Sequence, residues 1–349
     1  MRPTPVRIRG KRKREPPPIP VSVAAADGTP GKMKRSLASV RASRLSRHHT
    51  VLESLPAELL ETILLYSESL SLPRSSHLIG AKLSGRATLL RLFMVAFHDT
   101  WDQWFGVPKT QWHGPRIQEE DGPSFGGDAV FQSAMLELPW VDIDFILQAQ
   151  QAWSDRYARD RWYQHSVPFE VEAGSHHLNH DHQGGFSHFN ARDCFEADYR
   201  RALAWPAFKT ESMSWGTHDL HPMTRLPVDL VTGPWDDEKK RRLFWLARGG
   251  LQMGAESRNP VPVPWETKVA CLENAVINAE EPDPLIINCL IGNWVFLDLP
   301  EDIVRKHLVS LDRRLAWGGD EPASRGILRR IRSTLDVFMQ LPQYHHMPA

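Results

Sequence analysis

The sequence has 349 residues, of which 41% are hydrophobic and 24% charged, a composition typical of globular proteins. Lys and Arg total 42 and Asp and Glu also total 42, so the zero net charge argues against a uniformly basic nucleic-acid-binding protein. The three cysteines, Cys194, Cys271 and Cys289, form no disulfide framework or paired metal clip. The longest apolar run, 285–297, is shorter than the roughly 20 residues of a membrane helix. We therefore expect an intracellular protein of the cytoplasm or nucleus, with no membrane partner.

Charge is unevenly distributed along this chain. Residues 1–48 contain 13 Lys or Arg and 2 Asp or Glu, a net charge of +11, so the remainder carries −11. A basic stretch with few large apolar side chains buries too little surface to become ordered, and residues 1–50 are predicted to form a disordered tail. A short cluster in this tail resembles a nuclear import signal: Lys11, Arg12, Lys13 and Arg14. A solvated basic tail without that role is the alternative.

Ordered structure is expected from Val51 onward, beginning with three short helices. Apolar residues recur at helical spacing over 55–66, 75–84 and 86–104. Ser54 is the expected N-cap of the first helix, because a serine side chain can accept the unpaired N–H groups of a first helical turn. These helices are predicted to pack as a compact trio.

The first of these helices begins with a familiar motif. Leu-Pro-Ala-Glu-Leu at 55–59, followed by an apolar helix, resembles the start of an F-box. Leu-Pro-Arg-Ser-Ser-His-Leu-Ile-Gly at 72–80 is similar to the second helix of uncharacterised fungal F-box-like proteins. The resemblance covers about residues 51–105, and it departs from the family pattern by lacking a Val-Cys-x-x-Trp segment.

The F-box resemblance implies a non-catalytic adaptor that links a protein target to a Skp-type adaptor protein and a cullin ubiquitin ligase complex. Apolar side chains of the first helix would then pack against helices of the Skp-type partner. The expected contact residues are Leu55, Pro56, Leu59, Leu60, Ile63 and Leu64. The alternative is that these residues pack on the C-terminal helices of the same chain.

The rest of the chain, 106–341, is predicted to be a mostly helical domain that recognises the target, followed by a tail at 342–349. Gly, Pro and polar residues predict irregular loops at 106–136, 166–189 and 206–234. Helices are expected over the ranges 140–162, 190–205, 236–249, 264–279, 282–296, 300–316 and 324–341. The sequence therefore predicts a mainly α fold, with antiparallel helices in its last third. It leaves open whether 106–341 is one domain or two.

A second candidate site is the His-rich segment 176–188. Imidazole groups of His176, His180 and His182 suit zinc or iron, so a metal-dependent enzyme is one alternative to the adaptor. Neighbouring glycines oppose a stable helix there, and no His-Glu-x-x-His motif occurs. A nuclear scaffold with no ligase link is the other alternative. The chain has no nucleophile elbow or phosphate-binding loop, its cysteines are expected in the core, and no cofactor is predicted.

Overall fold

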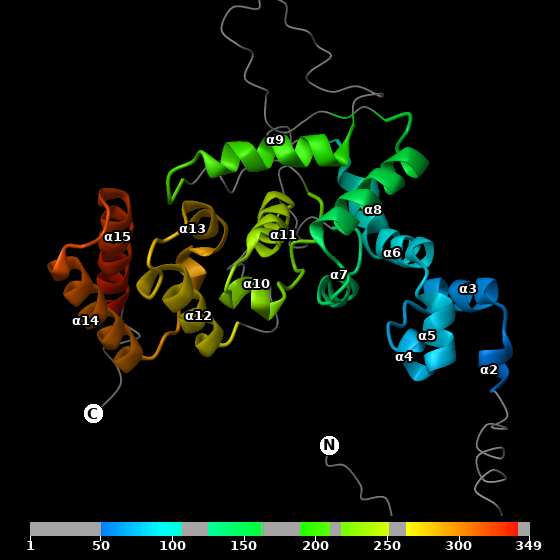
Figure 1. The fold of residues 1–349 in the computed structure, drawn as a ribbon, viewed down its shortest axis with the longest axis horizontal. Helices are drawn as coiled ribbons and strands as arrows, with labels where there is room; N and C mark the ends of the chain where they lie inside the picture. The colour runs from blue at the N-terminus through cyan, green and yellow to red at the C-terminus, as the bar shows by residue number, and fades with distance from the viewer. Residues whose placement is uncertain are drawn as a thin grey trace, which may run out of the picture. The chain divides into compact units, whose positions relative to one another are not determined.

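The computed structural model describes residues 50–106, 125–161, 163, 189–209, 218–250 and 263–340. The described residues from Val51 onward belong to a single compact unit. Within the described ranges the regular structure is helical and contains no β-strand, which confirms the predicted mainly α fold (Figure 1). Of the helices in these ranges, none has the length and apolar character needed to cross a bilayer.

Residues 50–106 form five helices, where three were predicted. They are α2 (Val51–Ser54), α3 (Ala57–Ser67), α4 (Leu72–Ser75), α5 (His77–Leu83) and α6 (Arg86–Trp104). Helix α6 has the predicted bounds. Ser76 separates α4 from α5, because its extended backbone (φ −153°, ψ 140°) interrupts the helix and its hydroxyl accepts the Leu78 N–H at 3.3 Å.

The predicted N-cap of the first motif helix is wrong. Ser54 ends the separate helix α2, and its hydroxyl donates to the Val51 carbonyl at 2.6 Å. Pro56 occupies the N-cap position of α3 instead, with an extended ψ of 152°. A proline suits the start of a helix because its missing N–H would have no helical acceptor there.

Three helices follow in the next described ranges: α7 (Ala129–Leu136), α8 (Ile143–Tyr157) and α9 (Ala191–Leu203). The prediction of an irregular loop through residue 136 is wrong, because helix α7 forms there. The Asp128 carboxylate caps this helix by accepting two backbone N–H groups, at 2.7 and 3.1 Å. Asn190, the first residue of the range predicted for this helix, caps α9 by accepting the Arg192 and Asp193 N–H groups at 3.0 and 3.1 Å. Leu203 is exposed at the last turn of α9.

The remaining helices alternate with short connections. They are α10 (Val228–Thr232), α11 (Asp237–Arg248), α12 (Trp265–Leu272), the π-helix η4 (Glu273–Ile277), α13 (Pro284–Leu290), the 3₁₀ turn η5 (Asn293–Val295), α14 (Glu301–Trp317) and α15 (Pro322–Met339). Helix α10 lies where an irregular stretch was predicted. Asp236 caps α11 by accepting the Lys239 N–H at 2.8 Å. Helices α14 and α15 pack side by side after a four-residue connection, 318–321 (Figure 1).

Buried apolar residues form two cores. The first core joins α3, α5 and α6 to α7, α8, α9 and α11, and its centre is aromatic: the Phe93 and Phe97 rings stack with centroids 4.4 Å apart, and Trp153 and Trp245 are fully buried. The second core joins α12, η4, α13, α14 and α15. The first core is continuous across residue 105, so the motif helices and the helices that follow share one interior.

Candidate functional site

Helix α3 has one buried face and one exposed apolar face. Leu60 and Leu64 are fully buried in the first core. Leu59, Ile63 and Tyr66 are 52%, 37% and 88% exposed, respectively. Their spacing of four and then three residues places them along one side of the helix, since each residue advances about 100° around the axis. We call these three residues the α3 stripe.

The predicted contact residues of the motif therefore divide into two groups. Leu59 and Ile63 belong to the α3 stripe, and Pro56 is exposed beside it in sequence, whereas Leu55 is partly buried against the first core. The expectation that Leu60 and Leu64 contact a partner is wrong, because both side chains are enclosed by this chain itself. Tyr66 was missed, although its spacing from Leu59 and Ile63 could have revealed it.

Polar contacts fix α3 on the rest of the molecule. The Lys82 ammonium group on α5 donates to the backbone carbonyls of Glu53 (2.8 Å) and Leu55 (2.7 Å), just before α3 begins. On another side of the helix, Glu61 forms an ion pair with Arg91 of α6 at 2.7 Å. The α3 stripe is therefore presented by a helix that is held by its neighbours as well as by its buried leucines.

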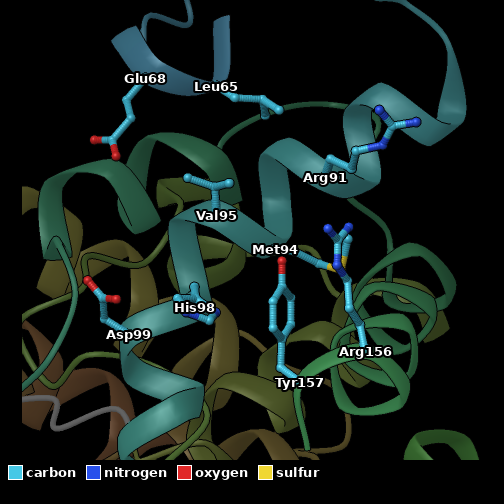
Figure 2. A pocket seen from close by; sticks show the side chains of 9 residues that line it. All are labelled: Leu65, Glu68, Arg91, Met94, Val95, His98, Asp99, Arg156 and Tyr157. Carbon is cyan, nitrogen blue, oxygen red and sulfur yellow. The ribbon is translucent and has the colours of Figure 1, made fainter. Parts of the chain in front are cut away.

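A pocket of about 520 Å³ opens between α3, α6 and α8 (Figure 2). Its lining comes from all three helices: Leu65, Glu68, Arg91, Met94, Val95, His98, Asp99, Arg156 and Tyr157. None of these residues was singled out from the sequence, because no motif connects residues that are so far apart along the chain. The pocket and the α3 stripe lie on different sides of α3, since Leu65 and Leu59 are six residues apart and thus far apart around the helix.

Charge in this pocket is divided between two sides. Figure 2 shows Arg91 and Arg156 on one side and Glu68 and Asp99 on the other. The Arg156 guanidinium lies 5.2 Å from the centre of the Tyr157 ring, a cation–π contact, and among the described residues it forms no ion pair. Tyr157 stands between the two sides, so an aromatic surface separates the opposite charges.

His98 is fixed within the pocket by its neighbours. The Trp153 indole N–H donates to His98 Nδ1 at 2.9 Å, and the His98 and Tyr157 rings meet edge to face with centroids 4.8 Å apart. Because Nδ1 accepts a hydrogen bond, the proton of the neutral ring is on Nε2. No serine, threonine, cysteine or lysine lies beside His98 among the residues that line this pocket.

A buried ionic cluster lies elsewhere in the described chain and was also missed from the sequence. Arg248 on α11 donates to Asp198 on α9 at 2.6 Å and to Asp219 at 3.1 Å, and Gln150 on α8 donates to Asp219 at 2.9 Å. Burial lowers the pKa of Arg248, but the two carboxylates outweigh it and hold that pKa above its ordinary value. The cluster connects α8, α9 and α11 and so has a structural role.

The cysteines offer no reactive thiolate. Cys194 and Cys271 are buried and Cys289 is partly buried, and all three are unbridged. Burial raises the pKa of Cys271 to about 12, and it also raises the pKa of Cys194 and of Cys289. Since the thiolate is the reactive form, these cysteines act as apolar core residues at neutral pH.

The other candidate residues of the sequence lie outside the described residues. They are the metal candidates His176, His180 and His182 and the basic cluster Lys11, Arg12, Lys13 and Arg14. Within the described ranges, no group of three or more His, Cys, Asp or Glu side chains is placed to hold a metal ion. The metal site and the nuclear import signal stay predictions.

Comparison of this sequence with protein-family models finds no matching family. Neither the curated proteins nor the solved structures give a match. The F-box resemblance therefore depends on the motif residues of the sequence alone.

Proposed function

We propose that this chain is an F-box-like substrate adaptor. The α3 stripe docks on a Skp-type adaptor of a cullin ubiquitin ligase, and the helices that follow hold a target protein near the ligase. No residue performs covalent chemistry in this proposal. The chain acts by raising the local concentration of the target at the site of ubiquitin transfer.

One observation carries the proposal: the Leu-Pro-Ala-Glu-Leu motif opens a helix whose Leu59 and Ile63 remain exposed while Leu60 and Leu64 are fully buried. Exposed apolar side chains in a row on a fixed helix are typical of a helix that packs against a partner. Tyr66 extends the same row, and tyrosine is a frequent anchor of protein interfaces.

Binding of the purified chain to a purified Skp-type adaptor, measured by calorimetry, tests the proposal. Burying the exposed parts of Leu59 and Ile63 contributes about 1 kcal/mol each, because each side chain is already partly covered. The double variant Leu59→Asp, Ile63→Asp also leaves two carboxylates to be desolvated, so we expect affinity to fall by about a hundredfold or more.

Val130→Asp on α7 is the matched control, because Val130 is also an exposed apolar helix residue but lies outside the α3 stripe. Its affinity should equal that of the unchanged chain. The proposal fails if the unchanged chain forms no complex, or if the double variant binds as tightly as Val130→Asp. Circular dichroism confirms that both variants keep their helices.

A further inference from the structure

We propose that the pocket between α3, α6 and α8 binds a peptide segment in which an apolar side chain lies between an acidic and a basic one (Figure 2). Its volume of about 520 Å³ falls within the range of sites that enclose small ligands or peptide side chains. The site is distinct from the α3 stripe, which faces away from it.

The floor of this pocket is apolar and accessible. Val95 and Tyr157 are among the exposed large apolar residues of the described chain, at 37% and 42% exposure, and both line the pocket. Met94 also lines the pocket but is buried in the first core, so Val95 and Tyr157 provide most of the accessible apolar surface. An apolar side chain of a ligand would cover these groups and remove their surface from water.

The basic side of the pocket has two arginines from different helices. The flat guanidinium of Arg156 is oriented by the Tyr157 ring rather than by a carboxylate in the described chain. Arg91 forms an ion pair with Glu61, but its side chain remains 46% exposed, so N–H groups of its guanidinium can reach a ligand. Guanidinium groups bind carboxylate and phosphate with matched geometry, which specifies an acidic group here.

The two carboxylates on the other side of the pocket restrict which ligands with an acidic group can bind. Glu68 and Asp99 lie across the pocket from the arginines, and they repel a ligand that is negative along its whole length (Figure 2). This opposes a nucleic-acid strand, which carries a charge on every phosphate. A peptide can place a lysine or a backbone N–H against these carboxylates while its acidic residue meets Arg156.

Fluorescence polarisation with the full chain tests the proposal. The probes are fluorescein-labelled nine-residue peptides with a central Leu, flanked by Lys on one side and by Glu or phosphoserine on the other, in both orders, with Ser and Gly elsewhere. We expect at least one order to bind, and peptides with Gln in place of Lys and Glu to bind at least tenfold more weakly. The Glu and phosphoserine series show which acidic group the arginines prefer.

Arg156→Gln should lower the affinity of the best peptide at least tenfold. Arg159→Gln is the matched control, because Arg159 is an exposed arginine three residues away that does not line the pocket, and it should leave binding unchanged. Val95→Glu should also weaken peptide binding, because it removes apolar surface from the floor of the pocket rather than an ion pair with the peptide. Both pocket residues are exposed, so their replacement leaves the cores intact.

The proposal is overturned if no peptide of either series binds, if both arginine variants have the same effect, or if a single-stranded oligonucleotide displaces the peptide at equal concentration. In the adaptor proposed above, the bound segment would belong to the target protein. Because the measurement contains no Skp-type adaptor, failure of peptide binding and failure of adaptor docking are distinguished.

Discussion

Replacing Leu64 and its neighbour Ile63 with alanine, one at a time, distinguishes the two faces of α3. Leu64 is fully enclosed in the first core, and truncating such a leucine costs roughly 2–5 kcal/mol in the free energy of unfolding. Ile63 is 37% exposed, and alanine has a better helix propensity than isoleucine by a few tenths of a kcal/mol. We therefore expect Ile63→Ala to cost less than about 1 kcal/mol.

Urea unfolding followed by circular dichroism at 222 nm measures both free energies. The slope with urea should be the same for the two variants, since both expose the same surface on unfolding. In thermal unfolding, Leu64→Ala should lower the midpoint by roughly 3–8 °C, because an unfolding entropy of about 2.1 cal/mol/K per residue makes 1 kcal/mol equivalent to about 1.5 °C in a unit of this size. Equal losses, or a larger loss for Ile63→Ala, would show that α3 is rotated and that the α3 stripe is not its exposed face.

Three further predictions concern features away from α3. Arg248→Met removes the buried cation that pairs with Asp198 and Asp219 and should lower the free energy of unfolding by roughly 3–5 kcal/mol, whereas Arg332→Met, whose side chain is 40% exposed, should change it little in the same urea titration. Asn190→Ala removes the cap of α9 and should cost about 1 kcal/mol, while Asn190→Ser retains a cap and most of the stability. Burial raises the pKa of Tyr199 to about 12, so above pH 10 the folded chain keeps a proton that the unfolded chain loses. Stability should therefore fall between pH 10 and 12, and Tyr199→Phe should make this fall less steep; an identical fall in the variant would contradict the assignment.

Local signals in the sequence were sufficient for helix boundaries that depend on a few neighbouring residues. Helix α6 has its predicted ends, and the predicted ranges 190–205 and 236–249 begin at the caps Asn190 and Asp236, because a capping side chain acts on N–H groups two or three residues away. Helices α7 and α10 were missed because they are short and lie among glycines and prolines. Their stability comes from packing of residues such as Phe131 and Leu230 in the interior, which a local pattern does not show.

The candidate site was only partly predictable, for a geometric reason. Leu59 and Leu60 are adjacent and both apolar, as are Ile63 and Leu64, so the motif contains two apolar faces and does not indicate which one the rest of the chain covers. That choice depends on contacts with α5 and α6. The pocket lining depends on the same long-range packing, since it joins the end of α3 to the last turn of α8.

Because the motif helices and the helices that follow share the first core, the protein cannot be divided between them into stable fragments. A cut after residue 105 would remove the helices that cover Phe93, Phe97 and Trp101 and leave their rings facing water. The F-box-like segment is therefore not an independently folding domain that could be moved to another protein, unlike domains joined by a linker. Mapping of its partners should therefore use point substitutions in the intact chain, because a truncated fragment would expose apolar surface that the native protein buries.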